Sequence, residues 1–188
     1  YVSNKSDCNN YFKTAEQRKS LGVADAKGII NYYKLSAKNI EGDFQTISGK
    51  TYFVDKEGNK IAGWVKKDGK WYHFNNKTAV MNKGFFKEAG NKFYLNPKTG
   101  EMTSGWFTIR GKSYLAKGNG VVVTNQIYTD GVKSYFFKKS GKRKNGWVTY
   151  KNAKYYFSKK KGMLKGKQKI KGKRYTFSKK TGKLRKKK

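Results

Sequence analysis

The amino-acid sequence predicts an all-β fold, a β-hairpin solenoid of about seven repeats of about 20 residues each, with a small helical N-terminal cap. Three observations support this prediction. Glycine followed by an aromatic residue recurs at a spacing of 21 residues, and a second glycine usually follows six residues later. Three residues after this second glycine stands an aromatic residue, and an apolar residue follows two positions further on. Aromatic residues make up 16% of the chain while hydrophobic residues make up only 36%, so large rings supply a thin core.

Residues 1–41 lack the repeat and are expected to form the cap. Apolar residues between Thr14 and Lys38 are spaced more like those of a helix than those of a strand, although Gly22 and Gly28 interrupt the pattern. We expect one or two short helices here, because the end of a solenoid needs a cap. The chain is thus predicted to comprise a partly helical cap region, residues 1–41, and a repeat solenoid with a basic C-terminal tail, residues 42–188.

The repeat is clearest between residues 63 and 107. Gly63-Trp64-Val65 returns as Gly84-Phe85-Phe86, Gly105-Trp106-Phe107 and Gly146-Trp147-Val148, with a weaker unit around Gln126-Ile127. The aromatic–apolar pairs of the successive units are Tyr52/Val54, Tyr72/Phe74, Phe93/Leu95, Tyr114/Ala116, Tyr135/Phe137, Tyr155/Phe157 and Tyr175/Phe177.

Each unit has the sequence properties of a β-hairpin. Residues at i and i+2 share one face of a strand, so each aromatic–apolar pair indicates a buried face. Glycine next to lysine, aspartate or asparagine, as in Lys67-Asp68-Gly69-Lys70, is typical of a tight turn. A lone hairpin is marginally stable in water, so we expect successive hairpins to stack through their aromatic faces.

Charge is the second informative property of the chain. The net charge is +34, and residues 131–188 contain 24 lysines and arginines without one aspartate or glutamate. A folded surface of this kind repels itself unless it holds counterions or meets a polyanion. If equivalent turns line up along the solenoid, their lysines form stripes on which a polyanion makes many weak contacts. The candidate polyanion-binding residues are Lys138, Lys139, Lys142, Arg143, Lys144, Lys159, Lys160, Lys161, Lys179 and Lys180.

The segment from Gly63 to Phe74 resembles the choline-binding and glucan-binding cell-wall repeat of Gram-positive surface proteins, and Gly100 to Trp106 resembles the join between successive repeats. The resemblance covers about three-quarters of the chain. It implies a hairpin solenoid that attaches an exported protein to the cell wall or cell surface without catalysis. In the choline-binding branch, aromatic residues and methionine from successive repeats hold a quaternary ammonium group. By position, the residues that this implies for an aromatic groove are Trp64, Trp71, Met81, Phe85, Met102, Trp106 and Trp147.

We therefore predict binding of an anionic envelope polymer, namely teichoic acid, lipoteichoic acid or an acidic exopolysaccharide. Lys133 and Lys154 stand where Trp71 stands in its unit, and a lysine there repels a bound cation, which argues against choline in most repeats. A choline-type cage and a glucan-binding module that stacks tryptophans on sugar rings stay as alternatives. Basic residues mixed with aromatic ones also suit nucleic acid, but no nucleic-acid-binding motif is present, so no specific nucleic-acid partner is expected.

The sequence does not predict an enzyme, a metal site or a cofactor. His73 is the only histidine, and it lies on a predicted strand beside Tyr72 and Phe74, where packing is its usual role. The carboxylates are scattered, and no pair of them suggests acid–base catalysis. No segment is apolar enough to span a bilayer. The single cysteine, Cys8, cannot form an internal disulfide and leaves a homodimer open.

Overall fold

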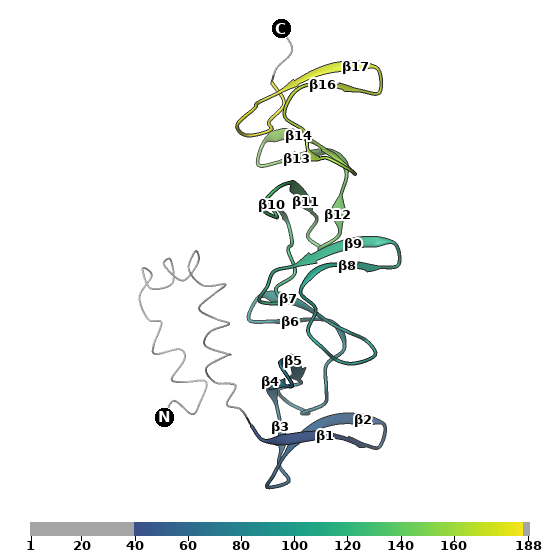
Figure 1. The fold of residues 1–188 in the computed structure, drawn as a ribbon, viewed down its shortest axis with the longest axis vertical. Helices are drawn as coiled ribbons and strands as arrows, with labels where there is room; N and C mark the ends of the chain where they lie inside the picture. The colour runs from purple at the N-terminus through teal and green to yellow at the C-terminus, as the bar shows by residue number, and fades with distance from the viewer. Residues whose placement is uncertain (1–39, 186–188) are drawn as a thin grey trace, which may run out of the picture. The chain divides into compact units, whose positions relative to one another are not determined.

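The structure is a computed structural model that describes residues 40–185, and it is all-β over that range (Figure 1). The all-β prediction is confirmed for these residues. The predicted helical cap lies outside them, apart from Ile40 and Glu41, which precede the first strand. The described residues form two compact units. Unit 1 comprises residues 40–104 and 118–121, and unit 2 comprises residues 105–117 and 122–185.

Unit 1 consists of antiparallel hairpins. The first sheet has the order β1-β2-β3, and two further hairpins pair β4 with β5 and β6 with β7. The strand bounds are β1 Gly42–Ile47, β2 Lys50–Asp55, β3 Lys60–Ile61, β4 Gly63–Lys67, β5 Lys70–Phe74, β6 Gly84–Glu88 and β7 Asn91–Leu95.

Unit 2 continues the same pattern. Its sheets have the orders β8-β9, β10-β11-β12, β13-β14-β15 and β16-β17. The strand bounds are β8 Gly105–Ile109, β9 Lys112–Ala116, β10 Gln126–Thr129, β11 Ser134–Phe137, β12 Arg143–Lys144, β13 Gly146–Tyr150, β14 Ala153–Ser158, β15 Gly162–Met163, β16 Gly166–Ile170 and β17 Lys173–Phe177.

The recurring glycine of the sequence repeat closes the hairpins. Between β4 and β5, Asp68 and Gly69 have φ angles of 50° and 76°. Two consecutive positive φ angles define the tight turn that matches the twist of paired strands, which explains the preference for glycine. Asn152 takes the place of glycine between β13 and β14 with a φ of 57°, because asparagine tolerates this backbone region better than most residues. The predicted turns are thus confirmed at these positions.

The predicted aromatic–apolar pairs form the core. Tyr72 and Phe74 are 6% and 0% exposed, and Tyr155 and Phe157 are 6% and 1% exposed. In each unit, a ring of one hairpin packs against the next hairpin. Phe53 of β2, for example, contacts Phe74 of β5 with ring centroids 6.1 Å apart. Stacking of hairpins within each unit therefore buries the face that the spacing predicted.

Methionine–glycine contacts join successive repeats inside unit 1. A Cβ atom at Gly100 would overlap the Met81 sulfur, and one at Gly120 would overlap the Met102 sulfur. Gly100 and Gly120 also have φ angles of 79° and 81°, which disfavour any side chain. These glycines therefore let the turn of one repeat lie directly on the methionine of the repeat before it.

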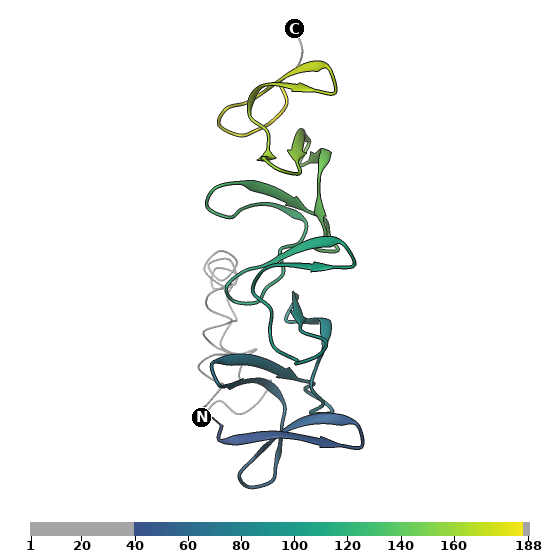
Figure 2. The same cartoon turned by 45° about the vertical axis from the view of Figure 1, so that its right-hand side comes forward.

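The hairpins of unit 2 do not all point the same way. In both Figure 1 and Figure 2, β8–β9 and β16–β17 point to the same side, whereas β10–β11 between them points to another side in Figure 2. The prediction that turns line up from one repeat to the next is therefore wrong for neighbouring hairpins. Each hairpin is rotated relative to the one before, so its lysines face a different direction.

Candidate functional site

Trp64 on β4 is the centre of an aromatic cluster in unit 1. Its ring lies 6.5 Å from that of Trp71 on β5, centroid to centroid, and 5.0 Å from that of Phe93 on β7. The ring of Phe86 on β6 lies 5.7 Å away. Trp64 and Trp71, both named for the predicted aromatic groove, thus lie near each other. The other rings around Trp64 are that of His73 on β5, 4.9 Å away, and those of Phe86 and Phe93, so the indole is held between two hairpins.

Glu88 at the end of β6 connects this cluster to His73. The Trp64 indole N–H donates to Glu88 Oε2 at 2.7 Å, and Asn76 Nδ2 donates to Glu88 Oε1 at 3.0 Å. His73 Nε2 lies 3.0 Å from the same Oε1, and Asn82 Nδ2 lies 2.7 Å from His73 Nδ1. His73 is only 3% exposed. The lone histidine is therefore a packed member of a hydrogen-bond network.

The network lowers the pKa of Glu88 below its ordinary value. Burial by itself raises the pKa of this carboxyl, but the hydrogen bond and charge of His73 outweigh it, together with the hydrogen bonds from Asn76 and Trp64. Sequence analysis missed Glu88, because it lies 15 residues from His73 and no local motif links the two. An acidic residue at a strand end of an otherwise basic chain was the one available signal.

The two methionines and Phe85 do not line one common cage. Met81 is buried in the core cluster that contains Phe53, Val65, Tyr72 and Phe74. Phe85 is 38% exposed, and its ring packs on that of Tyr94, with centroids 4.8 Å apart. Thus the predicted groove residues of unit 1 divide into two methionines, Met81 and Met102, that pack against a glycine of the next repeat, and partly exposed rings.

In unit 2, the exposed ring of Trp106 carries a cation of the chain itself. Trp106 is 42% exposed and meets the Tyr135 ring edge-on, with centroids 4.9 Å apart. The Arg143 guanidinium lies 4.4 Å from the Tyr135 centroid and 5.7 Å from the Trp106 centroid. Arg143 also donates to the carbonyl oxygens of Ser158 at 3.3 Å and Lys159 at 2.7 Å. Arg143, predicted to meet a polyanion, is therefore held in a half-buried position over aromatic rings.

Trp147 on β13 repeats this arrangement. Its ring meets Tyr156 at 5.2 Å and Tyr175 at 4.9 Å between centroids, and the Lys154 ammonium lies 4.9 Å from the Trp147 centroid. Lys154 was the residue whose position argued against choline. The structure thus brings a lysine of β14 over the ring that the groove prediction named, so a cation of the chain already faces that ring.

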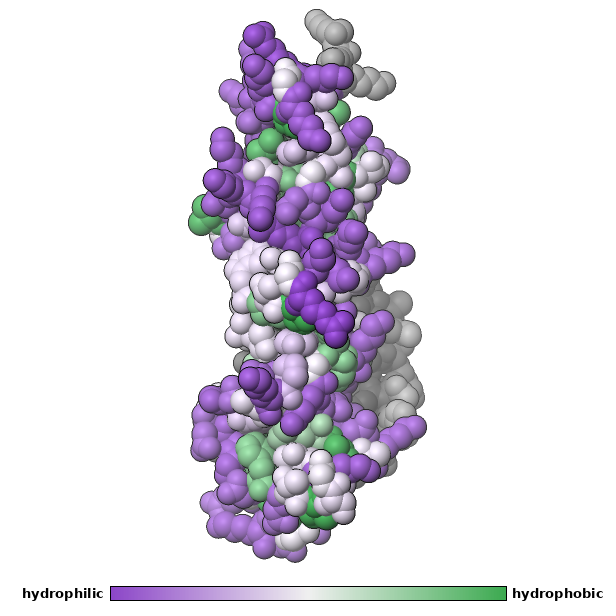
Figure 3. Space-filling view, turned by 90° about the vertical axis from the view of Figure 1, so that its right-hand side faces the viewer, coloured by the Kyte–Doolittle hydropathy of each residue, from purple (hydrophilic) through white to green (hydrophobic). Residues whose placement is uncertain are grey.

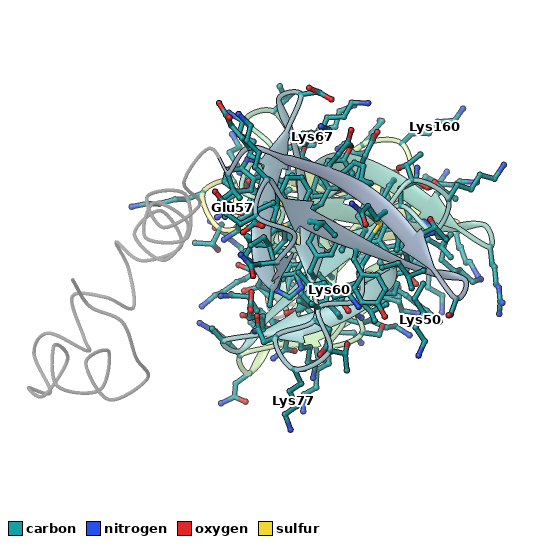
Figure 4. All side chains as sticks on the ribbon, turned by 90° about the horizontal axis from the view of Figure 1, so that it is seen from below. Lys50, Glu57, Lys60, Lys67, Lys77 and Lys160 are labelled. Atoms are coloured by element: carbon teal, nitrogen blue, oxygen red, sulfur yellow. The ribbon has the colours of Figure 1, made fainter. Side chains whose placement is uncertain are left out.

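The other predicted polyanion-binding residues are exposed and lie in recurring turns of unit 2. Lys138 and Lys139 follow β11, Lys159 and Lys160 follow β14, and a third pair follows β17. Hydrophilic residues cover most of the face shown in Figure 3, with hydrophobic residues in separate patches. In unit 1, Lys50 and Lys77 leave the ribbon on different sides (Figure 4). The residues of the third pair are Lys179 and Lys180, and Lys142, Lys144 and Lys161 are exposed as well.

The described residues contain no group of three histidine, cysteine, aspartate or glutamate side chains arranged to hold a metal ion. Among residues 40–185 there is also no helix with the length and apolar character needed to cross a membrane. What this part of the chain does offer is aromatic rings, internal cations and exposed lysines. These groups suit recognition of a ligand through charge and ring contacts.

Comparison with known proteins supports a wall-binding class. Residues 62–77 and 145–162 match the family described as "Putative cell wall binding repeat". These two segments thus match cell-wall-binding repeats, and the resemblance seen in the sequence is confirmed. No curated protein matches the chain by sequence.

Two solved structures from Streptococcus pneumoniae are similar to this chain. Choline binding protein F, crystallised with a peptidoglycan analogue, matches with a TM-score of 0.68 and 26% identity over 78% of this chain and 47% of that one. CbpJ matches with a TM-score of 0.68 and 22% identity over 72% of this chain and 49% of that one. The chain spans about half the length of either protein.

Proposed function

We propose that this chain binds an anionic polymer of the bacterial envelope, teichoic or lipoteichoic acid or an acidic exopolysaccharide, and thereby attaches to the cell surface without catalysis. The observation that carries the proposal is the charge of unit 2. After Asp130 the sequence contains no carboxylate side chain, and the four ion pairs among the described residues all lie in unit 1. The exposed lysines of unit 2 therefore lack an acidic partner from within that unit other than Asp130.

The lysine pairs after β11, β14 and β17 recur once per repeat, so a flexible polymer can meet several of them in turn. Because neighbouring hairpins point in different directions, the polymer has to wind around unit 2 to do so. Individually weak contacts add up when they are linked in this way.

Binding to purified cell walls with and without teichoic acid tests the proposal. We expect retention that depends on teichoic acid and falls steeply with salt, by roughly 0.7 log units per phosphate contact for each log unit of salt. The variant K159S/K160S, in unit 2, is compared with K77S/K98S, which removes the same charge from turns of unit 1. A larger loss for the unit 2 variant supports the proposal, whereas equal binding of the chain to stripped walls rejects it.

A second candidate function is recognition of a quaternary ammonium group on a wall polymer. It is favoured by the similarity to choline binding protein F and by the ring pairs around Trp64, Trp106 and Trp147. Arg143 and Lys154 already lie over two of these sites, which weighs against it. Elution from walls by millimolar choline at constant ionic strength would select this candidate over binding through charge.

Glucan binding is the third candidate, since Phe85 and Trp106 keep 38% and 42% of their surface exposed and can stack on sugar rings. Retention on dextran that resists salt would favour it. No enzymatic role is proposed, because the matched repeats and the geometry described above supply binding groups rather than a reacting pair.

A further inference from the structure

The hairpin β16–β17 differs from the other hairpins of unit 2 at four positions on one face. The corresponding face of β8–β9, β10–β11 and β13–β14 carries two cross-strand pairs in each hairpin. The first pair joins two apolar or aromatic side chains, and the second joins threonine to serine or lysine. In β16–β17 the same two pairs are Lys167 with Thr176 and Lys169 with Arg174. The tryptophan position itself has become Lys167. The pairs in the other three hairpins are Trp106/Leu115 and Thr108/Ser113, Ile127/Phe136 and Thr129/Ser134, and Trp147/Tyr156 and Thr149/Lys154.

The register places three cations and one hydroxyl close together. Lys169 and Arg174 face each other directly, so their Cβ atoms are about 5 Å apart. Lys167 and Lys169 are two residues apart on one strand, a separation of about 6.7 Å. All four side chains of this face are exposed, and all four line one shallow depression. We call Lys167, Lys169, Arg174 and Thr176 the cationic face.

The opposite face of the hairpin is fixed by packing. Phe177 is 1% exposed, and the Trp147 ring lies 4.9 Å from that of Tyr175 and 5.9 Å from that of Phe177. The cationic face is therefore carried by a strand pair with a buried side, the β16–β17 hairpin of unit 2 (Figure 1). Packing of the other face thus fixes the strand positions from which these side chains extend.

An exposed hairpin face can be covered by any mixture of polar residues. The cationic face is not such a mixture. Like charges directly opposite each other on a strand pair destabilise the sheet, and Lys169 and Arg174 form such a pair. No carboxylate follows Asp130 in the sequence, so no acidic residue of these last repeats offsets the repulsion. A bound anion would offset this repulsion.

We propose that the cationic face is a discrete site for the phosphodiester groups of a linear envelope polymer. Arg174 offers a planar set of donors that fits phosphate, the two lysines add positive charge, and Thr176 adds a hydroxyl donor. The proposal rests on the proposed function and gives it a defined site, separate from the lysines of the turns. Nucleic acid suits the site less well, because single-stranded nucleic acid needs rings for stacking and lysine has replaced the ring at position 167.

The test uses the full chain and poly(glycerol phosphate) lipoteichoic acid as the probe, at a fixed salt concentration near 0.15 M. The site variant is K169S/R174S. The matched control is K171N/K173S, which removes two charges from the turn of the same hairpin but not from the cationic face. We expect the site variant to weaken binding about tenfold or more, as for loss of a hydrogen bond to a charged group, and the control to weaken it about threefold or less.

A charge reversal separates binding from folding. In K169E, the new carboxylate faces Arg174, so we expect the melting temperature to stay level or rise while binding falls at least as far as in the site variant. A lower melting temperature would contradict the repulsion between Lys169 and Arg174 and overturn the argument for the site, and unchanged binding at a raised melting temperature would overturn the site itself.

The remaining outcomes are also decisive. Equal losses in the site variant and its control would overturn the discrete site and leave the proposed function standing. No binding of the natural chain to the polymer would overturn both. Equally strong binding of polyglutamate at pH 7, with the same sensitivity to K169S/R174S, would overturn phosphodiester selectivity, and tighter binding of single-stranded DNA through the same residues would replace the envelope polymer by nucleic acid.

Discussion

Replacing Glu88 by glutamine should destabilise unit 1, because this residue of β6 joins its hairpin to the one before: its carboxylate accepts hydrogen bonds from side chains of β4, β5 and the turn after β5. Its two oxygens receive the Trp64 indole N–H at 2.7 Å, the Asn76 amide at 3.0 Å and the His73 ring at 3.0 Å. A glutamine amide has one acceptor oxygen and presents N–H groups on its other side. At least one donor then lacks an acceptor in a site where the Glu88 side chain is only 13% exposed.

A buried donor without an acceptor costs about 1–3 kcal/mol, so we expect E88Q to lower the free energy of unfolding by about 2 kcal/mol. Urea unfolding followed by tryptophan fluorescence measures the change. The matched control is E101Q, since Glu101 pairs with Lys70 at 2.7 Å with 31% and 57% of the side chains exposed, and exposed pairs contribute less than about 1 kcal/mol. A loss in E88Q no greater than that in E101Q would refute the role assigned to the network.

The same substitution predicts a pH dependence. Because the pKa of Glu88 in the folded chain lies below its ordinary value of 4.5, the unfolded chain binds this proton more readily. The stability that the network contributes is therefore present above about pH 4.5 and is lost as the pH falls through the folded pKa. We expect the natural chain to lose more stability than E88Q between pH 6 and pH 3. Parallel curves for the two proteins would contradict the assigned cause.

Three further predictions follow from the packing and the charge. G100A should lower the free energy of unfolding more than G105A in denaturant melts, since both glycines have positive φ angles but only Gly100 contacts Met81. The backbone cost alone is about 1 kcal/mol, so equal losses in the two variants would exclude the methionine contact. R143Q should lower the free energy of unfolding by about 1 kcal/mol, because the cation–π contact is lost, and it should change the fluorescence of Trp106. An unaltered fluorescence spectrum would argue against the contact. Added salt or polyphosphate should raise the melting temperature of the natural chain, as expected when self-repulsion is screened, and a flat response to both would contradict the charge argument.

Local features of the fold could be predicted from the sequence because they depend on near neighbours in the chain. The alternation that buries Tyr72 and Phe74 has a period of two, and the turn at Asp68-Gly69 needs positive φ angles that glycine supplies. Both can be recognised within about ten residues. The proximity of Trp64 and Trp71 was likewise accessible, because both lie on one face of a short hairpin, where Trp64 is opposite His73 and Trp71 is opposite Lys66.

Contacts between repeats could not be predicted in the same way. Met81 was expected in a ligand cage, yet it packs beneath Gly100, because the path of the chain between hairpins sets what meets its sulfur. Arg143 was expected to face a polyanion, yet it lies over Tyr135 and donates to two carbonyl oxygens, because the sheet that contains β12 brings it there. Spacing gives the face of a strand on which a residue lies but not the partner opposite that face.

The sequence by itself determined the hairpins, their turns and the absence of carboxylates after Asp130, since each of these is a property of short segments or of composition. The tertiary structure alone decided which cations are free for a ligand and which are held by rings, and it showed that neighbouring hairpins point in different directions. The rotation from one hairpin to the next arises from the packing of aromatic faces and methionines between repeats. No residue spacing encodes that angle, and for this reason the sequence could give the charge of the surface but not its arrangement.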